Sequence, residues 1–199
     1  MPEVIFKENL SEKSYLDGEI LAKNKHEYVD GQVYAMAGAS KNHERIVLNI
    51  ASEFRQKLKD SPCEPFGSDV KVRTPTGNYR YPDCMVVCDD QSDNQYYTES
   101  PVILVEVISR STRKIDEQIK RMEYINIPTL KEYVLIEQDF VDVTVYRKSD
   151  QWRPTHYFLD DDILFESINL TLSVEEIYHR VENEDMSDFL QAKEALTDS

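Results

Sequence analysis

The sequence predicts a single α/β domain in which a central mixed β-sheet is flanked by helices and preceded by a β-rich N-terminal extension. Residues 102–108 form a nearly uninterrupted apolar and β-branched run, typical of a strand buried on both faces. Residues 41–59 carry apolar side chains at spacings of three and four, the period of an amphipathic helix. An Asp30-Gly31 pair between two β-forming segments indicates a hairpin over residues 26–36.

The chain has 199 residues, which is enough for one domain with a sizeable core. We expect one unit over residues 1–199. Within it, residues 1–40 form a helix and hairpin extension, residues 41–150 form the core, and residues 151–199 form C-terminal strands and acidic helices.

The first half of the chain offers further local signals. A short helix is expected over residues 11–21, before the hairpin. Ser40 or Asn42 can cap the helix that follows, which ends near Lys59, before Pro62 and Pro65. Two extended segments, 66–73 and 79–88, flank a turn at 75–78 and predict a second hairpin.

The second half alternates strands and helices. An acidic loop over 89–100 leads to the apolar strand, and Ser111 or Thr112 can cap a helix over 113–126 that ends before Pro128. Further strands are expected over 133–136, 141–146 and 152–158, followed by a solvated turn at 160–162. Ser173 begins a helix, and an acidic helical tail completes the chain.

Composition restricts the class of partner and the compartment. The net charge of −15 argues against a general nucleic-acid binder, although residues 41–121 hold 13 basic and 13 acidic residues and could form a local positive groove. Evenly mixed surface charge is the alternative. The chain shows no signal peptide and no apolar run long enough to span a bilayer, so we expect a cytoplasmic protein with no membrane partner. Its cysteines, Cys63, Cys84 and Cys88, are expected to be reduced.

One carboxylate stands inside the apolar strand. Glu106 must be protonated, paired or bound to a cation, because an unpaired buried carboxylate costs several kcal/mol. Asp83 lies at the mouth of the preceding strand, and Lys120 lies on the helix that follows. Mg²⁺ prefers one or two carboxylates plus water, so Asp83 and Glu106 suit it, with a carbonyl near Val107 as a further ligand. Lys120 would then orient the attacking water and steady developing charge on a phosphate.

Pro82-Asp83, followed about twenty residues later by Glu106-Val107-Ile108, resembles the PD-(D/E)XK signature of restriction-endonuclease-like nucleases. More narrowly, the chain resembles the Uma-two family of bacterial restriction-endonuclease-like proteins over about residues 15–150. The matching segments are 28–31, 35–40, His43 with Asn49, 68–73, 79–83, 105–109, 111–112, Asp116, Lys120, Tyr124 and 133–135. The resemblance implies a restriction-endonuclease-like core and a Mg²⁺-dependent endonuclease acting on DNA, with Mn²⁺ as a substitute. Small nucleases of this fold commonly act as homodimers.

The signature departs from the superfamily pattern at one position. Ile108 stands where the superfamily has its lysine, and the resemblance implies that Lys120 supplies this group from the following helix. Asp116, Lys120 and Tyr124 are spaced i, i+4 and i+8, so they share one helix face. The alternative is a solvated ion pair between Asp116 and Lys120, worth a few tenths of a kcal/mol.

Several other residues are secondary candidates, each with a structural alternative. Asp69 is a possible further carboxylate or a surface residue, and Glu44 a possible acidic ligand or a helix-dipole residue. His43 could contact phosphate, although capping or packing is favoured, and Tyr124 shares the lysine's face. Arg80 and Arg113 are phosphate-contact candidates, with exposed surface charge favoured.

Two functions from different classes remain. The first is a Mg²⁺-dependent nuclease, acting on DNA and with RNA left open. The second is a non-catalytic binding or assembly module on a nuclease fold, favoured by Ile108 and by the acidic composition. Binding of a divalent cation separates the two.

Overall fold

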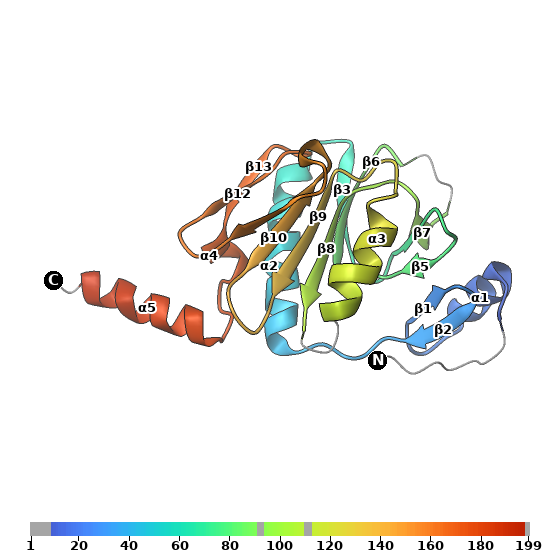
Figure 1. The fold of residues 1–199 in the computed structure, drawn as a ribbon, viewed down its shortest axis with the longest axis horizontal. Coiled ribbons are helices and arrows are strands. Elements are labelled where there is room, and N and C mark those ends of the chain that lie inside the picture. The colour runs from blue at the N-terminus through green and yellow to red at the C-terminus, as the bar shows by residue number, and fades with distance from the viewer. Residues whose placement is uncertain (1–8, 91–93, 110–112, 198–199) are drawn as a thin grey trace.

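The computed structural model describes residues 9–90, 94–109 and 113–197 (Figure 1). The expected caps Ser111 and Thr112 therefore lie outside the described residues. At the centre is a six-stranded sheet in the order β11-β10-β9-β8-β6-β3. Its strands are β3 (Cys63–Gly67), β6 (Cys84–Cys88), β8 (Pro101–Ile108), β9 (Glu132–Glu137), β10 (Val143–Arg147) and β11 (Pro154–Tyr157). The β8–β9 pair is parallel and the other pairs are antiparallel, so the mixed α/β class is confirmed.

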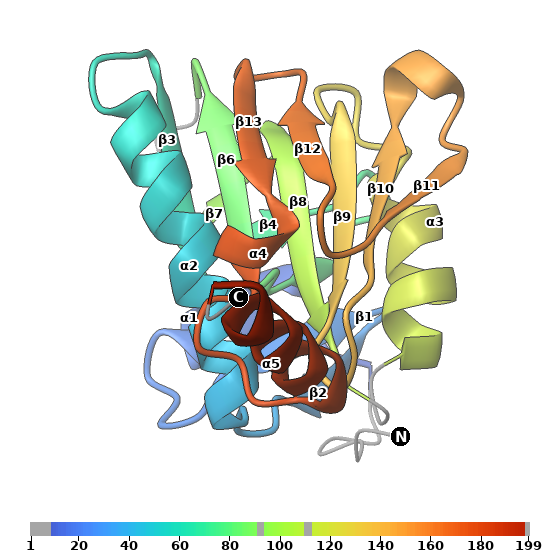
Figure 2. The same ribbon diagram turned by 90° about the vertical axis from the view of Figure 1, so that its left-hand side faces the viewer.

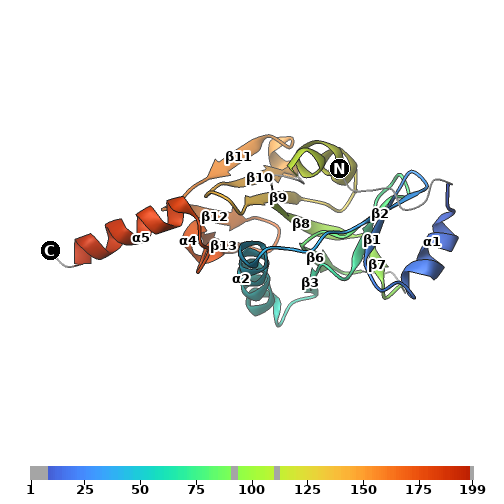
Figure 3. The same ribbon diagram turned by 90° about the horizontal axis from the view of Figure 1, so that it is seen from below.

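Helices cover both faces of this sheet, as Figure 3 shows. The long helix α2 (Lys41–Leu58) packs on one face through Ile46, Ile50 and Phe54. Turns η1 (Ile115–Lys120) and α3 (Arg121–Tyr124) cover the other, where Tyr124 joins Leu104 and Ile108 of β8. Alternate residues of β8 therefore meet opposite helices, which is why the whole strand is apolar except at Glu106.

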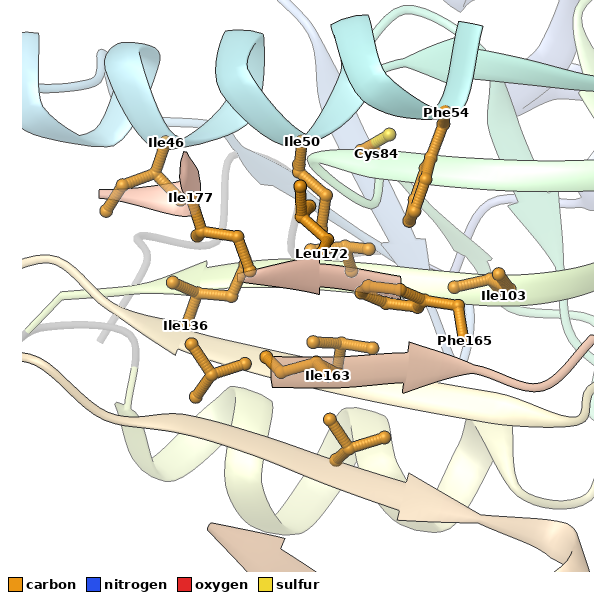
Figure 4. Packing of buried hydrophobic residues seen from close by; sticks show 14 of the residues in the cluster. Ile46, Ile50, Phe54, Cys84, Ile103, Ile136, Ile163, Phe165, Leu172 and Ile177 are labelled. Carbon is orange, nitrogen blue, oxygen red and sulfur yellow. The ribbon is translucent and has the colours of Figure 1, made fainter. Parts of the chain in front are cut away.

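The C-terminal segment completes the α2 face. Hairpin β12 (Asp162–Phe165) and β13 (Leu170–Ser173) leads into α4 (Val174–Ile177) and lies over the central sheet beside α2 (Figure 2). Figure 4 shows Phe165, Leu172 and Ile177 packed among the side chains of α2 and the sheet. The acidic helix α5 (Glu184–Thr197) then extends away from the body (Figure 1).

The N-terminal hairpin belongs to a second, smaller sheet, β2-β1-β5-β4-β7, whose other three strands come from residues 71–98, and α1 (Glu12–Glu19) lies beside it. Its strands are β1 (His26–Val29), β2 (Gln32–Ala35), β4 (Lys71–Arg73), β5 (Tyr79–Arg80) and β7 (Tyr97–Thr98). A cluster of Tyr15, Tyr28 and Tyr79 fills its interior. The chain leaves this sheet after Arg80 and enters the central sheet at Cys84, which places Asp83 at the junction of the two sheets.

Some local predictions require correction. The 66–73 and 79–88 segments do not form one hairpin, because each is divided: β4 pairs with β5 in the small sheet, while β3 pairs with β6 in the central one. The expected acidic loop contains the two-residue strand β7, and the expected turn at 160–162 gives way to β12 at Asp162. Ser173 does cap a helix, through a capping box, but that helix is one turn long. Short strands such as these depend on a distant partner rather than on a local pattern.

The expectation of reduced cysteines is wrong for two of them. Cys63 of β3 and Cys88 of β6 are directly opposite in the antiparallel register and form a disulfide. Cys84 is a free, buried thiol, and burial raises its pKa to about 12. The partner of Cys88 lies across the sheet on a strand that begins at Cys63, so this pairing depends on contact between two strands and not on cysteine spacing along one.

Within the described residues, no helix combines the length and the apolar character that crossing a membrane requires.

Candidate metal and catalytic site

Asp83 is held directly against the end of β8. The backbone N–H of Asp83 donates to the carbonyl of Val105 (3.1 Å), and the N–H of Val107 donates to Oδ2 of Asp83 (2.7 Å). Because Cys84 pairs with Val105, extending the antiparallel register by one residue places Asp83 opposite Glu106. The carbonyl of Val107 points to the same side of the strand as its N–H, and therefore toward Asp83.

Glu106 is buried on the face of β8 that meets η1 and α3. Its side chain is 3% exposed, and Oε1 accepts a hydrogen bond from the Tyr124 hydroxyl (2.9 Å) and lies 3.0 Å from Nζ of Lys120. Burial raises the pKa of Glu106 well above its ordinary value; Lys120 opposes this, and nearby carboxylates, Asp116 first, reinforce it. Of the three states expected for Glu106, which were protonated, paired or bound to a cation, the structure shows the paired one.

Lys120 lies among three carboxylates. Its Nζ is 3.0 Å from Glu106, 3.1 Å from Asp116 and 3.6 Å from Glu27. Burial lowers the pKa of Lys120, but these carboxylates outweigh that effect and raise it well above its ordinary value, so the amine stays charged. The Asp116–Lys120 pair weighed as a solvated contact is present but buried, with side chains 4% and 9% exposed.

The local helix geometry differs from the expected α-helix. Residues 115–120 form a π-helical turn, followed by a single α-turn. Asp116, Lys120 and Tyr124 still all turn inward and are buried. The hydroxyl of Tyr133 donates to the backbone carbonyl of Asp116 (2.9 Å), which anchors the wide turn to β9. Such π-turns are frequent at functional sites.

Glu27 on β1 belongs to this cluster, although sequence reasoning did not select it. Its Oε2 accepts from Nη1 of Arg80 (2.8 Å), and its Oε1 faces Lys120 and accepts weakly from the N–H of Tyr81 (3.3 Å). Burial would raise the pKa of Glu27, but Lys120 and Arg80 lower it below its ordinary value. Its position one residue before the Tyr28–Gly31 family segment was the signal that could have drawn attention to it.

Arg80 is neither an exposed charge nor open to a phosphate in this structure. Its side chain is 5% exposed, and its guanidinium bonds Glu27 on one side and both oxygens of Glu123 on the other, each at 2.8 Å. It links β1 to α3, so Arg80 is a buried, paired charge and not the exposed one that was favoured.

His43 contacts Asp83 from the first turn of α2. Ser40 caps this helix by accepting a hydrogen bond from the N–H of His43 (3.1 Å). The His43 imidazole is therefore not the capping group. Nε2 of His43 lies 3.3 Å from Oδ2 of Asp83, while Nδ1 is buried and finds no hydrogen-bond partner among the described residues. Burial lowers the pKa of His43, but Asp83, with smaller contributions from Glu44 and Asp116, raises it overall.

Three other candidates are engaged elsewhere. The carboxylate of Asp69 is 93% exposed and lies 3.1 Å from Lys25. The Glu44 side chain is 60% exposed, and only one oxygen approaches His43, at 3.9 Å. Arg113 is paired with Glu117 of the π-helical turn η1 and with Glu137 of β9, so it links these two elements. Their sequence patterns were local, and the fold directs these side chains away from the cluster.

The charge balance at the junction is negative. Four carboxylates gather here, from Glu27, Asp83, Glu106 and Asp116, against one permanent cation, Lys120, because Glu123 offsets the charge of Arg80. A protonated His43 offsets one more charge. Two or three negative charges remain, and a partly buried excess of this size must bind protons or a cation.

The junction offers few oxygen ligands for a hard divalent ion. Among residues 9–90, 94–109 and 113–197, no group of three or more His, Cys, Asp or Glu side chains gathers as a metal cage. Mg²⁺, however, typically takes one or two carboxylates and keeps several waters. Asp83 and Glu106 lie opposite each other on neighbouring strands and carry oxygen donors of the kind that Mg²⁺ takes, so the residues present are compatible with such an ion.

The fold has a nuclease-like α/β counterpart among solved structures. A crystal structure titled as a putative nuclease belonging to DUF820 from Anabaena variabilis ATCC 29413 superimposes with a TM-score of 0.64 and 18% identity, covering 79% of this chain and 91% of that one. At that identity the likeness concerns the fold.

Sequence comparison then gives the family. Residues 13–175 match the Uma2 family, described as "Putative restriction endonuclease", and the chain belongs to it. Two Synechocystis sp. (strain ATCC 27184 / PCC 6803 / Kazusa) proteins are similar. Uncharacterized protein slr1290 is 38% identical, covering 85% of this chain and 91% of its own length; uncharacterized protein sll1609 is 34% identical, covering 72% and 84%.

Proposed function

We propose that this protein is a Mg²⁺-dependent endonuclease that hydrolyses phosphodiester bonds of DNA at the junction of its two sheets. Asp83, Glu106 and the carbonyl of Val107 would hold the ion, and Lys120 would act on the attacking water. A homodimer in the cytoplasm, with each copy cutting one strand, is part of the proposal, as expected from the sequence.

The single observation that supports this most is the position of Lys120. The amine comes from a different element than the strand lysine of the superfamily, yet it lies 3.0 Å from Glu106. In the alternative, a solvated ion pair with Asp116, the amine would be exposed to water, whereas Lys120 is buried among three carboxylates.

The chain's own residues divide the work by charge. A bound Mg²⁺ supplies concentrated positive charge at the phosphate and makes a nearby water more acidic. Asp83 is fixed by the N–H of Val107, so its carboxylate is oriented before any ion arrives. Lys120 remains charged, so it donates hydrogen bonds to the water and to the developing negative charge rather than accepting a proton.

Substrate would approach from the Asp83 and His43 side. Their side chains keep 14% and 16% exposure, whereas those of Glu106 and Lys120 keep 3% and 9%. A separate hollow of about 730 Å³ lies at the start of α2, and neither His43 nor Asp83 is among its lining residues. Its lining is of mixed charge, with Lys41 and Arg45 beside Asp139 and Glu182.

Plasmid cleavage tests the proposal. Purified protein should nick or linearise plasmid with Mg²⁺ and not with chelator, and both Asp83→Ala and Glu106→Ala should lose the activity. Glu44→Ala, which removes an exposed carboxylate of the same helix turn as His43, serves as the control and should retain it. Cleavage that survives both site substitutions would identify a contaminant and contradict the proposal.

One observation favours the alternative, a binding or assembly module. Oε1 of Glu106 already accepts a hydrogen bond from Tyr124 and forms an ion pair with Lys120, so the carboxyl group has polar partners without a metal ion. This alternative predicts that millimolar Mg²⁺ leaves the melting temperature unchanged, whereas a bound ion raises it by mass action.

A further inference from the structure

The N-terminal hairpin reaches into the site through one side chain. Glu27 lies in the middle of β1, opposite Tyr34 of β2, and its neighbour Tyr28 pairs with Tyr79 of β5. Its backbone is thus held from both sides. The carboxylate projects from this small sheet toward Lys120, which belongs to the helical turn over the central sheet.

The two oxygens of Glu27 serve different partners. Oε2 accepts from Arg80 (2.8 Å). Oε1 lies 3.6 Å from Nζ of Lys120 and accepts from the N–H of Tyr81 (3.3 Å), two residues before Asp83. One carboxylate oxygen therefore contacts both the lysine and the segment that leads to Asp83.

We propose that Glu27 is a positioning residue that fixes the amine of Lys120 relative to Asp83, so that the hairpin is a working part of the hydrolytic site. The inference rests on the proposed function. Glu27 touches neither the ion nor the substrate in this account and acts through Lys120.

A purely structural role is the competing explanation, because Glu27 also neutralises Arg80. Glu123 provides a matched control. It neutralises the same guanidinium, with two hydrogen bonds of 2.8 Å rather than one, and Lys120 is not among its ion-pair partners. Removing the charge of Glu123 disturbs Arg80 at least as much as removing that of Glu27, so a difference between the two variants isolates the contact with Lys120.

Steady-state cleavage of a DNA duplex with Mg²⁺ is the first measurement. We expect Glu27→Gln to lower kcat about 10- to 100-fold, the usual effect of losing a residue that orients a catalytic group, with KM changed less than about threefold. Glu123→Gln should keep kcat within about threefold of wild type. Equal losses in the two variants would overturn the inference.

Acetylation of lysines in the metal-free protein, read by mass spectrometry, is the second measurement and needs no activity. Lys120 should be protected in wild type and in Glu123→Gln, and labelled several-fold faster in Glu27→Gln, relative to the exposed Lys148. Unchanged protection of Lys120 in Glu27→Gln would overturn the inference. If Glu27→Gln does not fold, Glu27→Asp replaces it: its shorter side chain keeps the charge but withdraws from Lys120, and the same increase in labelling is expected.

The two measurements separate the failure of this inference from failure of the proposed function. A wild-type protein that cuts no DNA refutes the nuclease, while the labelling pattern still decides whether Glu27 positions Lys120.

Discussion

Lys120→Met should lower the free energy of unfolding by about 3–5 kcal/mol, because removing one member of a buried ion cluster leaves uncompensated charge. Methionine nearly matches the volume of the lysine stem, so packing is conserved. Glu106, Asp116 and Glu27, however, would face one another without their shared cation. Denaturant unfolding at neutral pH measures the loss, and cleavage should disappear with it.

The loss should also depend on pH. Lys120 lowers the pKa values of Glu106 and Glu27, so its removal raises both in the folded state. A group whose folded pKa is raised contributes stability below its unfolded pKa and loses it as pH rises toward the folded pKa. The deficit of Lys120→Met relative to wild type should therefore be larger at pH 8 than at pH 5.

Lys148→Met is the control, since Lys148 is exposed and donates to the carbonyl of Pro128. It should cost little at either pH. A deficit below about 1 kcal/mol in Lys120→Met, the range of an exposed ion pair, would show that the amine is solvated and would contradict the buried cluster.

Asp83→Asn should lower cleavage by at least about 100-fold while leaving the metal-free protein folded. The amide can still accept from the N–H of Val107, so the hydrogen bond that fixes position 83 is retained. What is lost is the charge that faces the ion. In wild type, Mg²⁺ at a hundred times its dissociation constant adds about 2.7 kcal/mol of stability, and in the variant this gain should vanish.

Asp69→Asn is the matched control for that measurement, because its carboxylate is exposed and pairs with Lys25. It should keep both the cleavage and the Mg²⁺-dependent stabilisation. Stabilisation by Mg²⁺ that persists in Asp83→Asn would place the ion elsewhere.

Two features of the site could be predicted from the sequence: an acidic residue inside an apolar strand, and residues repeated at helical spacing. Glu106 is conspicuous because a lone acid in an apolar strand demands a partner, and the structure supplies Lys120. The i, i+4, i+8 spacing placed Asp116, Lys120 and Tyr124 on one inward face, and this survives the change from an α-turn to a π-turn. Both inferences depend on a few neighbouring residues.

The parts that sequence could not predict depend on contacts between elements far apart in the chain. Glu27 joins the cluster only because a hairpin 93 residues earlier than Lys120 packs beside it. Arg80 looked like a surface charge, and its burial follows from two acids on different elements. The Cys63–Cys88 bond follows from the pairing of β3 with β6. Pro65, in the middle of β3, made a strand there hard to predict, because proline disfavours strands.

Crystals soaked in Mn²⁺ provide the most direct test of the central claim. Anomalous difference density should appear between the carboxylates of Asp83 and Glu106, next to the carbonyl of Val107, with the Lys120 amine close by. Density at another place, or none at this junction in crystals at millimolar Mn²⁺, would contradict a metal-dependent hydrolytic site here.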